Sequence, residues 1–373
     1  MKIRTRSGDD LATVVFSSGS SGQPKGVMLS HHNILSNIEA VRTVFRLRED
    51  DNLCAVLPFF HSFGFTCALW LPIVSGVSAG YVASPIDGSL VGRCARQNGS
   101  TVLFAAPTFL LNYVRRVKQE DFANLRSVVA GAEKLKKSVA DGFEAKFGVR
   151  PLEGYGVTEL SPVVSLNLAN IEIGGVEQIG NKEGTVGQPI PGIAVRIVSP
   201  ESRKEMAVGE SGLLVVKGPN VMLGYLNKEE KTTEALKDGW YNTGDIASID
   251  KDGFLTIKDR LSRFSKIGGE MVPHVGVEEV YLSGLDTDEQ VVAVTGVPDA
   301  RKGEELVVLH LEKAGEADKL HEIISRSNLP NMWKPRRDNY IRIESMPALG
   351  SGKLDIVRLR KIAMVAKGSS GEG

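Results

Sequence analysis

The chain is organised around one run of small hydroxylated residues and glycines, Ser17-Ser18-Gly19-Ser20-Ser21-Gly22-Gln23-Pro24-Lys25-Gly26. Apolar runs lead into it (11–16) and out of it (27–29), so we expect a turn between two short strands. Glycines let backbone N–H groups approach an anion, serine hydroxyls donate hydrogen bonds, and the Lys25 ammonium supplies the counter-charge. The run therefore predicts a phosphate-binding loop, although its spacing is not that of the Walker loop. A flexible Gly/Ser linker is the alternative, and the flanking strands argue against it.

Length and composition indicate an ordinary two-domain globular protein. A chain of 373 residues exceeds the size at which single cores usually stop growing. Lys plus Arg and Asp plus Glu both number 45, which gives no global argument for a nucleic-acid partner or an anionic membrane. The three cysteines (Cys54, Cys67 and Cys94) show neither a disulfide framework nor zinc spacing, and residues 1–6 do not begin a secretory signal. We therefore expect a reduced, cytoplasmic setting.

The segment 52–86 has no charged residue unless His61 is protonated, so it could be mistaken for a membrane span. Prolines and glycines divide it into pieces that are too short to cross about 30 Å of hydrocarbon. We expect a strand over 53–57, a helix over 65–74 and a strand over 77–82, all buried in a large domain.

Alternating short apolar runs and amphipathic helices follow, as is typical of parallel βαβ winding. Strands are predicted over 101–106 and 127–130, with a helix starting at Pro107. The tripeptide Gly131-Ala132-Glu133 comes directly after the second of these strands. Open α/β sheets bind ligands at the carboxyl ends of their strands, so this tripeptide is a candidate ligand contact.

A second motif is Tyr155-Gly156-Val157-Thr158-Glu159. It offers an aromatic face for a base, a glycine for close approach, a hydroxyl for a phosphate and a carboxylate for Mg²⁺, a hard cation that prefers oxygen ligands. A strand end followed by a capped helix is the alternative interpretation.

A third motif is Gly239-Trp240-Tyr241-Asn242-Thr243-Gly244-Asp245. An ionised carboxylate only accepts hydrogen bonds, so Asp245 suits the two donors of a ribose diol. The alternative is an acidic turn, an interpretation that fits Asp250, Asp252 and Asp259 better.

The order of these motifs resembles that of the acyl-adenylate-forming (AMP-binding) superfamily, which includes acyl-CoA synthetases, acyl-acyl-carrier-protein synthetases, luciferases and peptide-synthetase adenylation domains. A fourth motif, Pro347-Ala348-Leu349-Gly350-Ser351-Gly352-Lys353-Leu354-Asp355, completes the order, with a simple surface lysine as the alternative. The resemblance covers about residues 14–361. Residues 16–22 and 258–272 most resemble the acyl-acyl-carrier-protein synthetase part of the bacterial bifunctional 2-acylglycerophosphoethanolamine acyltransferase/acyl-ACP synthetase.

The resemblance implies an α/β fold with a large N-terminal domain (1–261), a small mobile α+β domain (262–366) and a disordered tail (367–373). The large domain would have mixed, mainly parallel sheets flanked by helices, and a β-rich subdomain. Family members carry a long portion before the phosphate loop, so we expect an N-terminally truncated domain here. The missing upstream region would also be the part that allows peripheral association with the inner membrane.

The resemblance also assigns roles to individual residues. Residues implied to be catalytic are Lys353, Thr158, Glu159 and His61, with Glu159 as the Mg²⁺ ligand and His61 as a gate beside the carboxylate; a satisfied core histidine is the alternative for His61. Residues implied to contact the nucleotide are Ser17, Ser18, Gly19, Ser20, Ser21, Gly22, Lys25, Gly131, Ala132, Glu133, Gly154, Tyr155, Gly156, Asp245, Ile257 and Arg260. The implied hinge is Ser262, where the family commonly has Asp or Lys, and it precedes a hairpin over 266–272 that swings toward the active site.

The implied activity is ATP- and Mg²⁺-dependent activation of a fatty acid to its acyl-adenylate, followed by transfer to the phosphopantetheine thiol of acyl carrier protein. Coenzyme A as acceptor is the alternative. A catalytically incomplete nucleotide- or acyl-binding fragment and a partner-binding module are the other classes considered. The basic residues that could meet an acidic carrier protein are Lys334, Arg336 and Arg337, for which a solvated face is the alternative.

Overall fold

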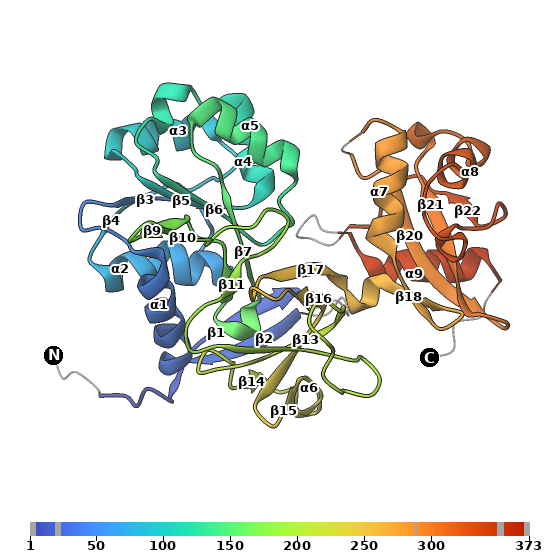
Figure 1. The fold of residues 1–373 in the computed structure, drawn as a ribbon, viewed down its shortest axis with the longest axis horizontal. Helices are drawn as coiled ribbons and strands as arrows, with labels where there is room; N and C mark the ends of the chain where they lie inside the picture. Colours follow the sequence, from blue (N-terminus) through green and yellow to red (C-terminus); the bar gives the residue numbers. More distant parts are fainter. Residues whose placement is uncertain (1–4, 19–23, 288, 349–353, 369–373) are drawn as a thin grey trace. The chain divides into compact units, whose positions relative to one another are not determined.

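The computed structural model describes residues 5–18, 24–287, 289–348 and 354–368. The chain divides into two compact units (Figure 1). The first unit comprises Met1–Ser17, Lys25–Thr243 and Ala247–Ile257, and the second comprises Ser18–Pro24, Gly244–Ile246 and Lys258–Gly373. The domain boundary expected between 261 and 262 stays a prediction. No helix within the described ranges is long and apolar enough to cross a membrane.

The first unit is built on a seven-stranded sheet. Its strands lie in the order β11-β8-β7-β6-β5-β3-β4. The pairs from β4 through β3, β5 and β6 to β7 are parallel, whereas β7 with β8 and β8 with β11 are antiparallel. The strand bounds are β3 Asn52–Ala55, β4 Ser78–Tyr81, β5 Val102–Ala105, β6 Ser127–Ala130, β7 Leu152–Gly156, β8 Val163–Leu166 and β11 Gln188–Pro189. This arrangement confirms the predicted mainly parallel sheet.

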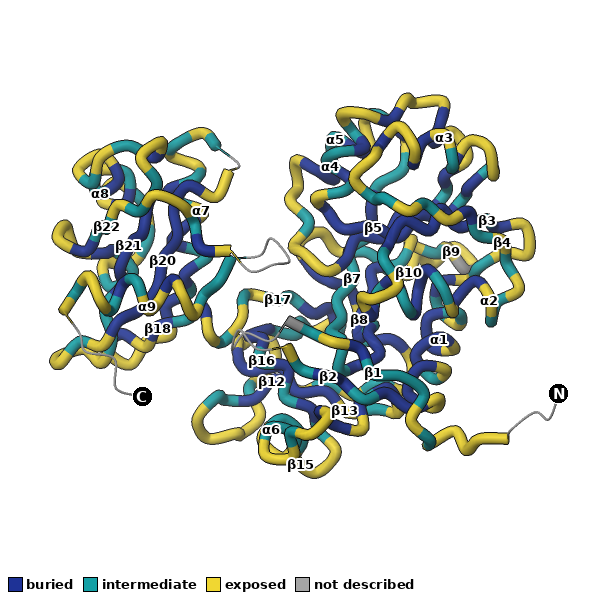
Figure 2. The backbone as a smooth tube through the Cα atoms, turned by 180° about the vertical axis from the view of Figure 1, so that it is seen from behind, coloured by how far each residue is buried: buried dark blue, intermediate teal, exposed yellow. Residues whose placement is uncertain are grey.

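Helices cover both faces of this sheet, with α3, α4 and α5 on one side and α1 and α2 on the other (Figure 1). Their bounds are α1 His31–Phe45, α2 Leu71–Ser75, α3 Gly88–Asn98, α4 Pro107–Arg116 and α5 Lys137–Phe147. The helix expected over 65–74 is divided into a π-helix, η1 Gly64–Trp70, and α2. Every residue of β5 and β6 is buried, and β5 is drawn dark blue in Figure 2. Strands that are buried on both faces carry mostly apolar residues, and all but Ser127 of these two strands are apolar.

Helix α1 begins directly after its N-cap residue, Ser30. Ser30 Oγ accepts from Asn33 N at 3.1 Å, and Asn33 Oδ1 accepts from Ser30 N at 2.9 Å. This reciprocal capping box satisfies two backbone donors that the first helical turn cannot pair internally.

The predicted phosphate loop is shorter than expected, because β1 Leu11–Ser18 and β2 Pro24–Ser30 extend into it. Residues 19–23 lie outside the described residues. Strand β14 (Gly224–Tyr225) pairs antiparallel with β2, the strand that leaves the loop. The backbone bonds Leu223 N to Met28 O at 2.9 Å and Leu226 N to Gly26 O at 2.8 Å hold it there.

A separate five-stranded sheet has the order β12-β13-β16-β15, and its fifth strand, β17, also pairs with β16. Its strands are β12 Ala194–Val198, β13 Gly212–Lys217, β15 Leu236–Lys237, β16 Trp240–Ile249 and β17 Leu255–Arg260. The remaining elements are the hairpin β9 Ile171–Ile173 with β10 Val176–Gln178 and the helix α6 Glu229–Ala235.

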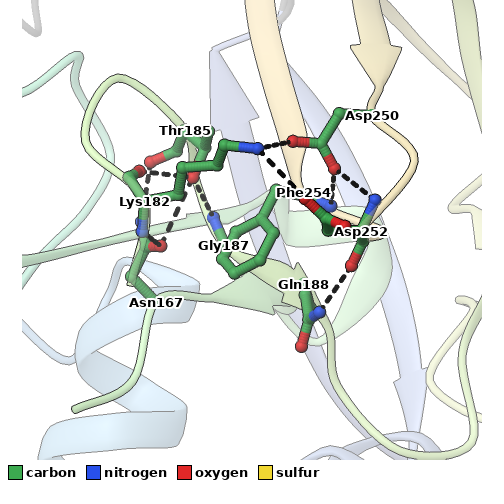
Figure 3. Close-up of polar contacts among 8 residues, drawn as sticks. All are labelled: Asn167, Lys182, Thr185, Gly187, Gln188, Asp250, Asp252 and Phe254. Atoms are coloured by element: carbon green, nitrogen blue, oxygen red, sulfur yellow. Dashed lines mark hydrogen bonds and ion pairs between the residues drawn. The ribbon is translucent and has the colours of Figure 1, made fainter. Parts of the chain in front are cut away.

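The loop before β11 is attached to the turn between β16 and β17 (Figure 3). Lys182 Nζ pairs with the carboxylate of Asp250 and lies 3.5 Å from Oδ2 of Asp252. Gln188 Nε2 donates to Asp252 O at 2.7 Å. At Gly187, where φ is +81°, a Cβ would lie 2.0 Å from the carbonyl carbon of Leu166, so only glycine fits. Asp250 and Asp252 therefore belong to an acidic turn, as the sequence suggested, whereas the same prediction was wrong for Asp259, which lies in strand β17.

The second unit is an α+β sandwich on a sheet in the order β19-β18-β21-β20, with β22 parallel to β21. The strands are β18 Phe264–Ile267, β19 Glu270–Pro273, β20 Val292–Asp299, β21 Gly303–His310 and β22 Tyr340–Arg342. The helices are α7 His274–Gly284, α8 Ala317–Ser325 and α9 Ile356–Ala366. The hairpin predicted over 266–272 is confirmed, because β18 and β19 pair antiparallel.

A buried ionic cluster is formed by residues of β18 and α7 and of the turn before β18. Arg263, in the 3₁₀ turn Leu261–Arg263, donates to Glu278 Oε2 at 2.5 Å, and its Nε lies 3.6 Å from Asp259 Oδ2. His274 Nε2 lies 2.8 Å from Ser265 Oγ. Burial, with the charge of Arg263 adding to it, lowers the pKa of His274 to about 3. The imidazole is therefore neutral in the folded unit.

Replacing His274 by Gln should make the second unit less sensitive to acid. Below pH of about 6.5 the unfolded chain protonates this histidine whereas the folded unit does not, so folding stability falls as pH drops from about 6.5 toward 3. Burial raises the pKa of Asp259 to about 6 and also raises that of Glu278. These two shifts increase folding stability as pH drops, which opposes the effect of His274, and they are present in wild type and in the variant alike. Amide exchange in β20 between about pH 7 and pH 4.5 should show wild type losing up to about 1.4 kcal/mol per pH unit relative to the variant. Parallel pH dependences would contradict the assignment.

Candidate active site

The first group of predicted site residues lies at the carboxyl end of β7. Thr158 and Glu159 lie in the 3₁₀ turn η3 Thr158–Leu160, which follows the strand directly. Thr158 Oγ1 is 3.1 Å from Ser62 Oγ, and Glu159 Oε1 accepts a hydrogen bond from the Tyr225 hydroxyl at 2.9 Å. Both Thr158 and Glu159 are half-buried. A hydroxyl and a carboxylate are thus held side by side at the sheet edge where α/β folds bind ligands.

The glycines of this strand have packing reasons for their presence. A Cβ at Gly156 would lie 2.2 Å from the Pro162 carbonyl oxygen, because β7 and β8 approach closely at a bulge. A Cβ at Gly154 would lie 3.1 Å from Leu166. Tyr155, between them, is half-buried and pairs with Ser165 in β8. The close strand approach accounts for Gly156 whether or not a nucleotide lies nearby.

The turn Gly131-Ala132-Glu133 follows β6 at the same end of the sheet. Ala132 has φ of +71°, a left-handed conformation that is uncommon for residues other than glycine. Glu133 Oε2 accepts from Thr108 Oγ1 at 2.6 Å and from Thr108 N at 3.3 Å. A Cβ at Gly131 would lie 3.0 Å from the Phe63 ring. The turn is therefore held by α4 on one side and an aromatic ring on the other.

Glu153, beside Gly154 in β7, is a carboxylate that sequence reasoning did not select. Its Oε1 accepts from Leu135 N at 3.0 Å. Burial raises the pKa of this carboxyl above its ordinary value. It fixes the chain just beyond the Gly131 turn, and no local pattern in the sequence would have indicated that contact.

His61 is exposed, and its ring lies against Phe60 with ring centroids 4.5 Å apart. Its backbone N donates to Pro58 O at 3.2 Å. An exposed imidazole does not fit the alternative of a satisfied core histidine, whereas the role as a gate stays a prediction.

A second group brings together two residues predicted to contact ribose. Asp245 Oδ1 lies 3.1 Å from Arg260 Nε. The Asp245 side chain is 5% exposed and that of Arg260 is 50% exposed. Ile257, also predicted for the nucleotide, lies half-buried in β17. The structure thus places Asp245 and Arg260 in contact, although they lie 15 residues apart in the sequence. Both residues were implied to contact the nucleotide.

The remaining predicted residues are divided between β-strands and undescribed positions. Ser17 and Ser18 lie in β1 and Lys25 lies in β2, with its Nζ 4.8 Å from the centroid of the Tyr225 ring. The predicted residues outside the described ranges are Gly19, Ser20, Ser21, Gly22 and Lys353.

The described part of the chain contains no group of three or more His, Cys, Asp or Glu side chains that could hold a metal ion. Glu159 is a single, half-buried carboxylate with one oxygen hydrogen-bonded by Tyr225. That donor set does not fit a metal cage, but it fits Mg²⁺, which commonly takes one or two carboxylates together with substrate phosphates and water.

A sequence model of the family described as AMP-binding enzyme matches residues 2–226. The chain belongs to the AMP-binding enzyme family. It is 35% identical to a long-chain-fatty-acid–CoA ligase of Salmonella typhimurium over 314 residues, which are 82% of this chain and 53% of that ligase. It is 32% identical to a long-chain-fatty-acid–CoA ligase of Bacillus subtilis over 92% of this chain and 60% of that ligase. The solved structure of ATP-bound MatB from Rhodopseudomonas palustris superposes with a TM-score of 0.79 at 28% identity, covering 96% of this chain and 69% of MatB.

This member of the AMP-binding enzyme family spans about half of the length of the first curated relatives that it matches. The family and the α/β fold predicted from the motifs are confirmed. The matched relatives are coenzyme A ligases by name, and none of those named here supports the closer resemblance to acyl-acyl-carrier-protein synthetases.

Two contacts of the site were missed in the sequence. These are the contacts of Ser62 and Tyr225, neither of which was expected beside the second motif. Their contacts with Thr158 and Glu159 span 96 and 66 residues. Contacts of that range depend on strand pairing and not on local pattern.

Proposed function

We propose that this chain, or the protein that contains it, activates a fatty acid with ATP as an acyl-adenylate and transfers the acyl group to a thiol. The observation that carries this proposal is the Glu159 carboxylate, held by the Tyr225 hydroxyl beside Thr158 at the carboxyl end of β7. The family membership and the two fatty-acid ligases among the relatives support the same activity and substrate class.

In the first step one carboxylate oxygen of the acid attacks the α-phosphorus of ATP, and pyrophosphate leaves. We assign the loop residues 17–22 and Lys25 to the departing pyrophosphate, and Thr158 to a phosphate oxygen. Glu159 would hold Mg²⁺, which neutralises phosphate charge when it is bound. Tyr155 would stack on adenine, and Asp245 with Arg260 would bind the ribose. These roles amount to catalysis by positioning and electrostatics.

In the second step the thiol sulfur attacks the carbonyl carbon of the acyl-adenylate, and AMP leaves. We assign Lys353 to the first step and the turn residues Gly268 and Gly269 to the thiol step, with Ser262 as the hinge between two working orientations. Gly268 and Gly269 have φ of +57° and +92° and form the tight turn between β18 and β19.

Coenzyme A is the acceptor that we propose. The matched relatives named above are coenzyme A ligases, and the basic residues considered for a carrier protein are engaged within the second unit. Arg337 pairs with Asp318 at 2.7 Å, Arg336 lies 3.4 Å from Glu305, and Lys334 donates to backbone carbonyls of Ser325 and Ser327.

The test is exchange of labelled pyrophosphate into ATP with a panel of fatty acids, followed by thioester formation with coenzyme A or holo acyl carrier protein. We expect acid-dependent exchange and faster transfer to coenzyme A. The absence of exchange with every acid would overturn the ligase proposal. Faster transfer to carrier protein would overturn only the choice of acceptor.

Replacing Glu159 by Gln should raise the Mg²⁺ concentration needed for half-maximal exchange by roughly 10-fold or more, because the amide keeps the size but lacks the charge that a hard cation needs. Replacing Glu172, an exposed residue of β9, by Gln is the matched control. An unshifted Mg²⁺ titration in the Glu159 variant would remove this residue from the metal site.

A further inference from the structure

Tyr225 lies where three parts of the first unit meet. It ends β14, lies opposite Val27 of β2, and is 4% exposed. Its hydroxyl donates to Glu159 Oε1 at 2.9 Å. The same strand region is tied to Glu159 a second time, because Met222 N donates to Glu159 O at 2.9 Å. Both the backbone and the carboxylate of Glu159 are therefore fixed by one segment.

The face of the Tyr225 ring makes a separate contact. Lys25 Nζ lies 4.8 Å from the ring centroid, within the range of a cation–π interaction. Lys25 belongs to β2, directly after the loop that we assign to pyrophosphate. One side chain thus contacts the carboxylate proposed for the metal through its hydroxyl and the lysine of the loop through its ring.

The hydroxyl of Tyr241 lies 3.4 Å from that of Tyr225. Since the Tyr225 proton is used toward Glu159, Tyr241 is the donor in this contact. Burial, the largest cause, together with the charge of Glu159, raises the pKa of Tyr241 far above its ordinary value, so its hydroxyl stays protonated. The chain of donors from Tyr241 through Tyr225 to Glu159 has one direction and orients the carboxylate.

We propose that Tyr225 is a positioning residue of the adenylation site, which holds Glu159 Oε1 so that Oε2 is left to bind the metal and which holds Lys25 toward the pyrophosphate. The proposal rests on the proposed function of the same site. A hydrogen-bonded carboxylate enters the metal complex already oriented, and loss of such an outer-shell partner typically costs 10- to 100-fold in metal affinity or activity. The ring contact stabilises the ammonium group and leaves its positive charge in place.

The first experiment measures Mn²⁺ binding by electron paramagnetic resonance in the presence of a nonhydrolysable ATP analogue. Tyr225→Phe removes only the hydroxyl, and we expect Mn²⁺ to bind roughly 10- to 100-fold more weakly. The matched control is Tyr113→Phe, which removes another buried tyrosine hydroxyl, one that donates to Pro85 O at 2.8 Å in the same unit. We expect Mn²⁺ binding within about twofold of wild type for this control. An equal loss in both variants, or none in Tyr225→Phe, would overturn the proposal.

A double-mutant cycle separates positioning from general damage. If Tyr225 acts through Glu159, then Tyr225→Phe should cause no further loss of Mn²⁺ affinity once Glu159→Gln is present. Additive losses would show that Tyr225 stabilises the fold independently of the carboxylate, and would overturn the proposal even if Tyr225→Phe alone binds metal poorly.

The ring contact has its own readout. Tyr225→Leu removes the ring as well, and we expect the KM for pyrophosphate in the exchange reaction to rise roughly two- to fivefold beyond that of Tyr225→Phe. Equal KM values in the two variants would overturn the Lys25 half of the proposal. The behaviour of wild type distinguishes failure of this proposal from failure of the proposed function. If the proposed function is wrong, wild type itself neither exchanges pyrophosphate nor binds Mn²⁺ in the presence of the analogue, and both proposals are overturned.

Discussion

Replacing Arg263 by Met should lower the free energy of unfolding of the second unit by about 3 to 5 kcal/mol. The side chains of Arg263 and Glu278 are only 8% and 5% exposed and are joined at 2.5 Å. Removing the guanidinium leaves the Glu278 carboxylate buried, with the backbone N of Val294 still donating to it at 2.6 Å. It also removes the guanidinium whose Nε lies 3.6 Å from Asp259 Oδ2. Denaturant-dependent amide exchange in β20 measures the loss, because this strand belongs to the core of the unit.

The matched control is Arg337→Met. Arg337 and Asp318 form a pair of similar length, 2.7 Å, but their side chains are 71% and 72% exposed. Exposed pairs contribute no more than about 1 kcal/mol, so the control should unfold almost as wild type does. The double variant Arg263→Met with Glu278→Met should recover much of the loss, since it removes the unpaired charge. Equal effects of the two arginine substitutions would mean that the buried pair is not what stabilises this unit.

The second large effect is expected for Asp245→Ala, which should weaken ATP binding by about 2 to 4 kcal/mol, or roughly 30- to 1000-fold. The carboxylate is 5% exposed and already lies 3.1 Å from Arg260 Nε, so it is desolvated and oriented before a ligand arrives. Two hydrogen bonds from a ribose diol to such a charge are stronger than those to a solvated one. Calorimetric titration with ATP in excess Mg²⁺ is the measurement.

Asp252→Ala serves as the control for Asp245, because Asp252 is a carboxylate of the exposed turn after β16 and pairs with Lys182. ATP affinity should be unchanged in that variant. Unchanged affinity in Asp245→Ala would remove Asp245 from the nucleotide site, whereas a similar loss in both variants would indicate a general effect of charge.

The sequence alone determined the features that depend on neighbours along the chain. The capping box of Ser30 and Asn33, the parallel strands separated by amphipathic helices and the acidic turn at Asp250 and Asp252 all follow from residues a few positions apart. The order of the four motifs identified the family, because a run of specific residue types in a given order is itself a property of the sequence.

Only the tertiary structure decided which of these residues meet. The loop strands extend further than the glycine-rich run suggested, and β14 pairs with β2 although about 200 residues separate them in the sequence. The contact of Tyr225 with Glu159 depends on that strand pairing, and the ion pair of Arg263 with Glu278 depends on the packing of α7 against β20. Strand register and helix packing are selected by the burial of whole apolar faces, and the polar contacts that result from this selection leave no local pattern in the sequence.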